Sequence, residues 1–232
     1  MTTAPVAMHI PDGFLSGGVA AAAALVALPA VAYGLRVAGR DLDEERVPLL
    51  GVLAAFVFAV QMLNFPVAGG TSGHLLGAAL AAVLLGPWLA SVVLTVVLLV
   101  QAFVFADGGV TALGANVLNM GVLGALLAGV TLTALVRALP ATRTGYLSAV
   151  GIVAWVAVMA GAAVTSVELA ASGTVPLETV LPAMLGVHAL IGIGEAVITI
   201  AAVSAVLASR PDLIRIRPRR EVVIGSVTPR EA

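Results

Sequence analysis

The sequence predicts an all-α polytopic membrane protein with seven transmembrane helices. Three observations support this prediction: 61% of the 232 residues are hydrophobic, only 10% are charged, and the apolar residues occur in long runs. Soluble domains typically carry about 25% charged residues. The composition therefore excludes a soluble globule, a nucleic-acid-binding protein and a disordered chain. Cysteine is absent, which excludes disulfides, thiolate metal sites and cysteine nucleophiles.

Seven apolar runs follow one another along the chain. A helix needs about 20 apolar residues to cross roughly 30 Å of hydrocarbon. The third run is short, and Gly86 and Pro87 separate it from the fourth, so these two runs could form one kinked helix or two helices. The runs cover residues 17–38, 49–67, 74–85, 88–105, 113–135, 146–171 and 181–208.

The arginines favour two separate helices at Gly86. All eleven basic residues are arginines, and basic residues concentrate on the cytoplasmic side of a membrane. Seven spans place all eleven on one side, whereas six spans place Arg137 and Arg143 opposite the others. We therefore expect seven helices in the cell (inner) membrane, with the N-terminus outside and the C-terminus in the cytoplasm.

Three regions follow from this topology: an extracellular segment over 1–16, a transmembrane domain over 17–208 and a basic cytoplasmic tail over 209–232. Residues 1–16 contain no Arg, no Lys and no apolar run, so no removable signal peptide is predicted. The outer segments carry Asp12, Asp107 and Glu178 but no basic residue. This pattern favours cations over anions at the outer surface.

Two of the three histidines lie in outer segments that glycine and proline prevent from being helical. His9 lies in the sequence MHIPDG, and His74 ends the sequence GGTSGH. Imidazole is a common ligand of nickel, copper, zinc and cobalt ions, so two histidines on one side allow a metal site. The alternative is that His9 caps a loop and His74 hydrogen-bonds the first turn of its helix.

A chain that begins at Met8 would supply two more nitrogen ligands. Translation from Met8 or removal of residues 1–7 would produce such a chain. The free amine of Met8, the deprotonated amide nitrogen of His9 and the His9 ring would then chelate one ion, and His74 could add a fourth nitrogen. Four nitrogens in a plane suit Cu(II) or Ni(II) and could also hold Co(II). In a chain that keeps residues 1–7, Met8 has no free amine and the chelate is incomplete.

Four motifs occur in order between residue 8 and about residue 207: MHIPDGFLS, NFPV with GTSGHLLG, QA through FADGG to GAN, and HALIGIGE. Together they resemble the CbiM/NikM family, the substrate-capturing membrane subunits of energy-coupling-factor (ECF) cobalt and nickel importers. The resemblance implies a six-helix ECF substrate-binding core with one additional N-terminal helix. It also implies an ion held by the amine of Met8, the amide and ring nitrogens of His9 and the ring of His74.

Further polar residues are candidates for supporting roles. Asp107 lies beside two glycines and either fixes its loop or attracts the cation. The remaining candidates would line the site or orient its ligands, with hydrogen bonding between helices as the alternative; they are Asn64, Ser72, Asn116 and Asn119.

His188 and Glu195 are seven residues apart and therefore share one face of the last helix, roughly 10 Å apart. Ionisable residues inside membranes often mark proton relays. For this pair, a buried structural or subunit-contact role is favoured over proton relay or coupling, because the family's metal site lies elsewhere.

The expected function is a metal-ion-binding subunit of an ATP-driven ECF-type importer. It would capture Co(II), which is favoured over Ni(II), as substrate, without a prosthetic group, and would supply cobalamin biosynthesis. The chain has no G-x-x-x-x-G-K-[ST] motif, so partners would hydrolyse ATP. The resemblance implies a transmembrane coupling component, two cytosolic ATPase subunits and a small accessory membrane subunit as those partners.

Three alternatives remain open from the sequence. The first is a nickel importer subunit of the same family, because the same four nitrogens accept both ions. The second is a stand-alone proton-coupled metal transporter in which His188 and Glu195 carry protons. The third is a membrane metalloenzyme that uses His9 and His74, although the chain contains neither H-E-x-x-H nor G-x-S-x-G.

Overall fold

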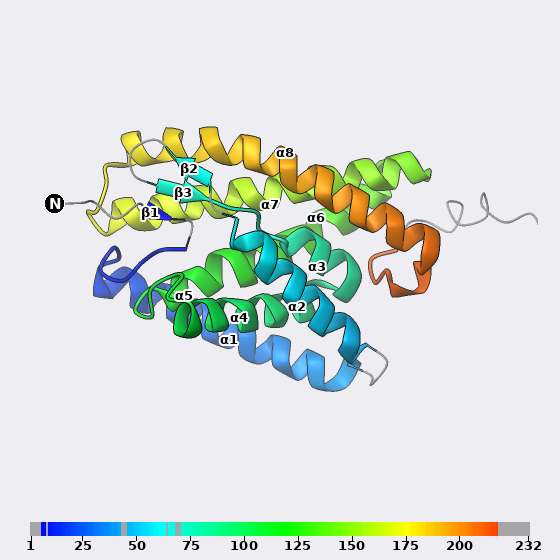
Figure 1. Ribbon diagram of the computed structural model, residues 1–232, viewed down its shortest axis with the longest axis horizontal. Helices are drawn as coiled ribbons and strands as arrows, with labels where there is room; N and C mark the ends of the chain where they lie inside the picture. The colour runs from blue at the N-terminus through cyan, green and yellow to red at the C-terminus, as the bar shows by residue number, and fades with distance from the viewer. Residues whose placement is uncertain (1–5, 8, 43–45, 64, 68–70, 218–232) are drawn as a thin grey trace, which may run out of the picture.

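The computed structural model describes residues 6–7, 9–42, 46–63, 65–67 and 71–217. Within this part of the chain, seven helical segments run back and forth between two ends of one bundle (Figure 1). The fifth segment is composite, because the π-helix η1 interrupts it between α5 and α6. The elements are α1 (Gly17–Asp41), α2 (Val47–Gln61), α3 (Ala78–Leu85), α4 (Pro87–Val104), α5 (Leu113–Asn116), η1 (Val117–Leu123), α6 (Gly124–Ala138), α7 (Arg143–Ala171), α8 (Leu177–Ser209) and the short 3₁₀ helix η2 (Pro211–Leu213).

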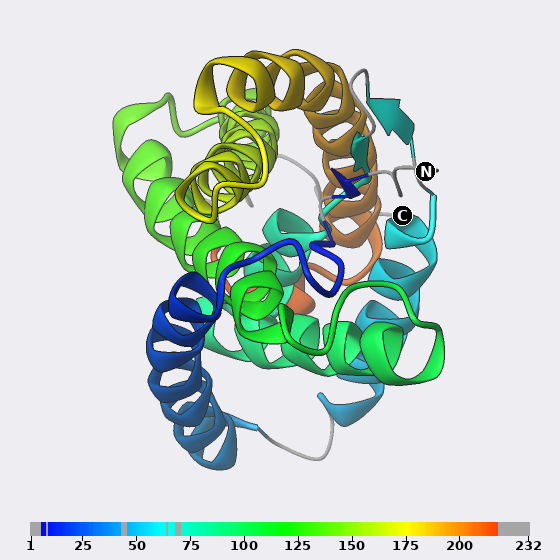
Figure 2. The ribbon, with the colours of Figure 1, turned by 90° about the vertical axis from the view of Figure 1, so that its left-hand side faces the viewer.

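The two ends of the bundle differ in the residues they carry. One end, which we call the histidine end, holds the α4–α5 and α7–α8 connections and the segment that precedes α1. Seen from this end in Figure 2, the segment after His9 crosses the middle of the ring of helices. The opposite end holds arginines at the helix termini: Arg40 in the last turn of α1, Arg46 before α2, Arg137 in the last turn of α6 and Arg143 at the start of α7.

The predicted break between the third and fourth segments is confirmed. Gly86 has a φ angle of +82°, in the left-handed region that glycine adopts at no steric cost. Pro87 begins α4, where its missing N–H group removes no helical hydrogen bond. The chain therefore reverses at Gly86, and α3 and α4 are separate helices.

Two of the expected helices are shorter than their apolar runs. The run over 49–67 is helical only to Gln61, where α2 ends, and the run over 74–85 is helical only from Ala78. With eight residues, α3 is about 12 Å long, well under the hydrocarbon thickness. Residues 74–77 are non-helical and buried. Hydropathy does not distinguish these two conformations, because a buried extended segment is as apolar as a buried helix.

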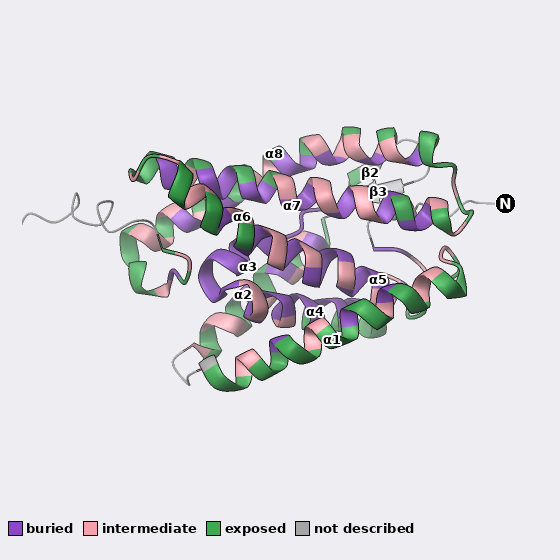
Figure 3. Cartoon of the chain, turned by 180° about the vertical axis from the view of Figure 1, so that it is seen from behind, coloured by how far each residue is buried: buried purple, intermediate pink, exposed green. Residues whose placement is uncertain are grey.

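Five helical stretches are long and apolar enough to cross a membrane, which makes the chain a multi-pass membrane protein. Large apolar side chains cover the outside of the bundle, for example Leu25 of α1 at 73% exposure and Leu190 of α8 at 70%. The buried residues face the interior (Figure 3). The five stretches are Gly17–Arg40, Pro87–Val104, Leu113–Ala138, Arg143–Ala171 and Leu177–Ser209.

Small residues allow close helix packing inside the bundle. A Cβ atom on Gly114 would lie 2.6 Å from the Cβ of Ala24 in α1, and one on Gly129 would lie 2.7 Å from the Cβ of Pro87 in α4. Such close approach is typical of helix contacts in membranes, where van der Waals packing replaces the hydrophobic effect.

A small sheet at the histidine end was not part of the predicted all-helical fold. The strands β1 (Val6–Ala7), β2 (Phe65–Val67) and β3 (Thr71–Gly73) pair in the order β1-β3-β2. β1 runs parallel to β3, with Ala7 opposite Ser72, and β2 runs antiparallel to β3. Non-helical backbone in an apolar protein needs hydrogen-bond partners, and the sheet supplies them. The register also brings the two histidines together. Ala7 lies opposite Ser72, and His9 and His74 each follow two residues after this pair.

Candidate metal centre

The imidazole rings of His9 and His74 stack at the histidine end. Their centroids are 4.2 Å apart and their planes differ by 16°. Both side chains are buried, with exposures of 1% and 0%. The spacing matches that of neighbouring strands, as expected from the β1–β3 register. Residues 65 positions apart in the sequence thus present their rings at one place.

Only one of the four ring nitrogens of this pair has a hydrogen-bond partner in the described chain. His74 Nδ1 lies 2.7 Å from the carbonyl oxygen of Leu75, so Nδ1 carries the hydrogen and Nε2 keeps its lone pair. Among the described residues, no hydrogen-bond partner is found for His74 Nε2 or for either ring nitrogen of His9. Buried polar atoms are nearly always hydrogen-bonded. Each neutral imidazole has one nitrogen lone pair, so the two rings supply two nitrogen donors of the kind that bind transition-metal ions.

Asp107 adds a negative charge beside His9. Its Oδ1 atom lies 3.4 Å from His9 Nδ1. Burial alone would raise the pKa of Asp107, but the contact with His9 and the nearby imidazoles lower the pKa below its ordinary value. The side chain is therefore a carboxylate at neutral pH. Its backbone N–H also donates to the Gln101 carbonyl, so Asp107 both fixes its loop and faces the histidines.

The residue after His9 is held by the α4–α5 connection and α5. The Ile10 N–H donates to Asn116 Oδ1 at 2.8 Å, and Asn116 Nδ2 donates to the Ile10 carbonyl at 3.1 Å. The Gly109 N–H donates to the same carbonyl at 2.8 Å. Ile10 itself is fully buried. Asn116 therefore pairs with the backbone of Ile10 as a neighbouring strand would, and this pairing orients the segment that carries His9.

The same segment is attached at two further points. Asp12 Oδ1 accepts hydrogen bonds from the N–H and the hydroxyl of Thr111, at 2.7 and 2.6 Å. The Thr111 hydroxyl and N–H lower the pKa of Asp12 below its ordinary value. The Thr174 hydroxyl, in the α7–α8 connection, donates to the Phe14 carbonyl. The His9 segment is thus bound to two connections of the bundle.

His74 belongs to a non-helical stretch, residues 73–77, which we call the His74 strap. The N–H groups of Leu76 and Gly77 donate to Glu195 Oε2 and Oε1 of α8, at 2.8 and 2.7 Å. Gln61 of α2 donates to the Leu76 carbonyl at 2.8 Å. Gln61 was not among the residues singled out from the sequence. A polar side chain inside the apolar run over 49–67 is the signal that would have identified it.

His188 contacts the other end of the strap. Its Nδ1 atom lies 2.7 Å from the Met184 carbonyl within α8. A Cβ atom on Gly73 would lie 2.7 Å from His188 Nε2 and 2.6 Å from the Cδ1 of Ile191. The ring is fully buried and packs directly on the backbone of the strap.

The remaining candidates do not join the site. Asn119 Nδ2 donates to Glu168 Oε2 at 2.6 Å and to Thr165 Oγ1 at 3.3 Å, so it links η1 to α7. Met8 and Asn64 lie outside the described residues. Ser72 contributes its backbone to the sheet, and its side chain is likewise not described.

Side chains alone do not complete a metal site in the described part of the chain. No group of three or more His, Cys, Asp or Glu residues that could hold an ion occurs there.

Known proteins resemble this chain over most of its length. A protein-family profile described as a cobalt uptake substrate-specific transmembrane region, CbiM, matches residues 9–213. A putative metal transport protein of Haloquadratum walsbyi is 40% identical over 209 residues, which cover 89% of this chain and 93% of that protein. A fused nickel transport protein, NikMN, of Rhodobacter capsulatus is 36% identical over 227 residues, covering 92% of this chain and 65% of that protein.

A solved structure shares the fold. The crystal structure of a transition metal transporter superposes with a TM-score of 0.79 at 32% sequence identity, covering 86% of this chain and 92% of that chain. The matched family is a membrane transport component for cobalt and nickel rather than a known enzyme. The chain therefore belongs to the CbiM family of cobalt uptake substrate-specific transmembrane regions.

Proposed function

We propose that the chain is the metal-capturing subunit of an ATP-driven ECF-type importer, and that it binds Co(II) or Ni(II) as substrate at the outer surface. The observation that carries this proposal is the buried, stacked pair of His9 and His74 beside the Asp107 carboxylate, in which His74 Nε2 and both ring nitrogens of His9 lack a hydrogen-bond partner in the described chain. A transported ion is the only metal required, and no prosthetic group is part of the proposal.

Four nitrogens hold the ion in this proposal: the Met8 amine, the His9 amide nitrogen, a His9 ring nitrogen and His74 Nε2. The amine and the two His9 nitrogens form fused chelate rings, which close through His9 Nδ1. A planar set of four nitrogens suits Ni(II) and also accepts Co(II). The proposed ligand set requires a chain that begins at Met8.

Binding of one ion by both histidines requires a change in the stack. Two nearly parallel rings 4.2 Å apart cannot both point a lone pair at the same ion, because each nitrogen lone pair lies in the plane of its own ring. His74 would lose its 2.7 Å hydrogen bond to Leu75 if its ring turned. His9 has no such bond within the described chain, so His9 is the ring that turns.

The arginines support an orientation in which the histidine end faces the outside. Arg40, Arg46, Arg137 and Arg143 lie at the opposite end of the bundle, and arginine concentrates on the cytoplasmic side. We therefore place the N-terminus outside the cell (inner) membrane and the tail over 209–232 in the cytoplasm.

The proposed partners supply the energy. They are a transmembrane coupling component, two cytosolic ATPase subunits and a small accessory membrane subunit. Two relatives are named as fused nickel transport proteins, NikMN, and such fusion supports assembly with other subunits. Delivery of cobalt to cobalamin biosynthesis is the proposed use of the imported ion.

Native mass spectrometry of two purified chains tests the proposal, one beginning at Met1 and one at Met8, each exposed to equal Co(II) and Ni(II). The Met8 chain is expected to retain one ion, and the spectrum identifies which. His9→Ala and His74→Ala variants of that chain should retain none. Retention of the ion by both variants would overturn the site, and equal retention by the Met1 chain would remove the amine from the ligand set.

A further inference from the structure

The strap that carries His74 is attached to α8 at a point separate from the metal ligands. Leu76 and Gly77 donate their N–H groups to the two carboxylate oxygens of Glu195, at 2.8 and 2.7 Å. Glu195 is 3% exposed and lies 119 residues from Leu76 in the sequence. Each carboxylate oxygen thus accepts one backbone N–H group of the strap.

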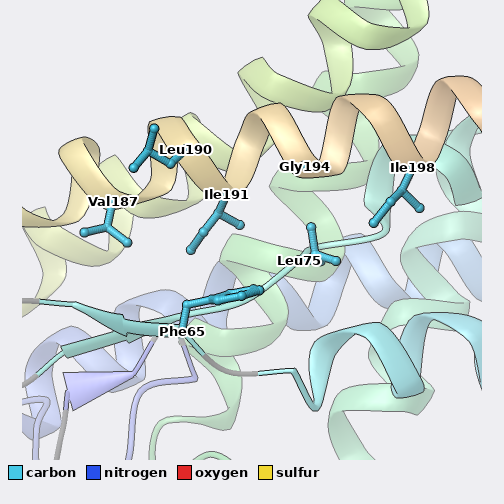
Figure 4. Close-up of a pocket in the computed structure, with 7 residues that line it drawn as sticks. All are labelled: Phe65, Leu75, Val187, Leu190, Ile191, Gly194 and Ile198. Carbon is cyan, nitrogen blue, oxygen red and sulfur yellow. The ribbon is translucent and has the colours of Figure 1, made fainter.

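The apolar packing between the strap and α8 is incomplete. Leu75 of the strap points toward α8 beside Ile191, Gly194 and Ile198 (Figure 4). An apolar cavity of about 340 Å³ lies between them; its lining is Phe65, Leu75, Val187, Leu190, Ile191, Gly194 and Ile198. The cavity leaves part of the contact between Leu75 and α8 unfilled. The hydrogen bonds to Glu195 are the directional contacts that hold the strap on α8 beside it.

We propose that Glu195 is a positioning residue that sets the location of the His74 ring and thereby the affinity for the metal ion. Glu195 holds the strap two residues after His74, while His188 packs under Gly73, one residue before it. The two side chains lie on one face of α8, so a single helix supports both sides of the ligand. The proposal rests on the proposed function, because it assumes that His74 binds the ion.

A consequence concerns the release of the ion. His9 is held by Asn116 and Gly109, whereas His74 is held by α8. Movement of α8 relative to the α4–α5 connection would therefore separate the two imidazoles. Because α8 extends from the histidine end to the opposite end (Figure 1), a partner acting at that opposite end has a direct mechanical route to the site.

The Glu195→Gln variant of the Met8 chain tests the positioning role. Glutamine has the same shape but only one acceptor oxygen, so its NH₂ group would face the N–H of Leu76 or Gly77, donor against donor. Loss of such a supporting contact typically lowers metal affinity by about 10- to 100-fold. We expect that loss for Ni(II), measured by competition titration, with an altered ligand-field absorption spectrum at saturating Ni(II).

Glu168→Gln is the matched control. Glu168 is also a buried carboxylate of a membrane helix, but it accepts from Asn119, and the glutamine oxygen can accept the same bond. We expect wild-type affinity and a wild-type Ni(II) spectrum. The spectrum separates positioning from general destabilisation, because a partly unfolded sample loses bound ion without changing the coordination of the ion that remains.

Each outcome bears on one proposal. If the unsubstituted chain binds no Ni(II), the proposed function fails. If it binds Ni(II) and Glu195→Gln binds with the same affinity and spectrum, the positioning role fails while the function stands. Should Glu195→Gln not yield folded protein, Glu195→Asp takes its place, because it keeps both acceptor oxygens on a shorter side chain. An affinity below that of wild type with a shifted spectrum supports the role, and wild-type values overturn it.

Discussion

The two histidines of the candidate centre touch each other but are supported by different parts of the molecule. His9 lies in a segment bound mainly to the α4–α5 connection, through Gly109 and Thr111, and to Asn116 at the end of α5. His74 lies in a strap bound to the membrane helices themselves, through Glu195 of α8 and Gln61 of α2. The two regions meet in the ring stack and in the pairing of β1 with β3. A site built on two such supports can be opened by moving one support against the other.

The supports also differ in how closely the chain fits. A Cβ atom on Gly109 would lie 2.3 Å from the Asp12 nitrogen and 2.6 Å from the Pro11 carbonyl carbon. A Cβ atom on Gly73 would meet only side-chain atoms, of Ile191 and His188. Backbone atoms cannot move aside as the ends of side chains can. An added Cβ atom is therefore tolerated less well beside the His9 segment than in the strap.

The largest expected effect comes from removing either ring. His9→Ala and His74→Ala should each lower Ni(II) affinity by more than the about 10- to 100-fold typical of a lost supporting residue, because each removes a ligand. Because one ion uses both rings, the unsubstituted chain should bind one Ni(II) per molecule, and each substitution should weaken binding of that same ion. Titration of the Met8 chain measures this. Two Ni(II) ions per chain, with one lost in each single variant, would indicate two separate sites and would end the comparison between two supports of one site.

The next largest effect on Ni(II) affinity is expected from alanine substitution of Gly109 and Gly73, and it should differ between the two. Gly109→Ala should displace the backbone of the His9 segment and lower Ni(II) affinity by about 10- to 100-fold, as for other residues that orient ligands. Gly73→Ala should cost less, because the Ile191 side chain can change rotamer. Thermal unfolding of both variants serves as the control for folding. A larger loss of affinity in Gly73→Ala would reverse our ranking of the two supports.

Two asparagines of one interrupted helix give a third comparison. Asn116→Ala removes both bonds to Ile10 and should lower Ni(II) affinity by about tenfold or more. Asn119→Ala removes the bonds to Glu168 and Thr165 and should lower stability by about 1–3 kcal/mol with little change in affinity. Affinity and thermal unfolding are measured on both variants. Equal loss of affinity would mean that the α7 contact also supports the centre.

Much of this architecture could be predicted from the sequence. The one-sided arginines gave the correct number of helical segments, and the Gly86–Pro87 pair located the break. The motifs around His9 and His74 identified the pair that stacks. The parallel register of β1 and β3 could not be predicted, because strands of two and three residues are too short to show a hydrophobic period. The partners of Glu195 could not be predicted either, since they are backbone N–H groups, which every residue except proline carries.

The smallest expected effect concerns charge beside the site. Asp107→Asn keeps the shape of the side chain but removes the carboxylate 3.4 Å from His9 Nδ1. The Ni(II) association rate should fall by about tenfold or less at low ionic strength, and the difference should shrink as salt screens the charge. The pKa of Asp107 is lowered, so the side chain remains a charged carboxylate at every pH above that lowered pKa. It takes up a proton, and loses its charge, only when the pH falls through that lowered pKa. The rate ratio of wild type to Asp107→Asn should therefore be constant between about pH 6 and 8. Stopped-flow mixing across this range measures the ratio, and a ratio that falls toward pH 6 would show that the carboxylate takes up a proton there. In that case pH would set the charge beside His9, whereas the position of the strap that carries His74 would depend on α8 alone.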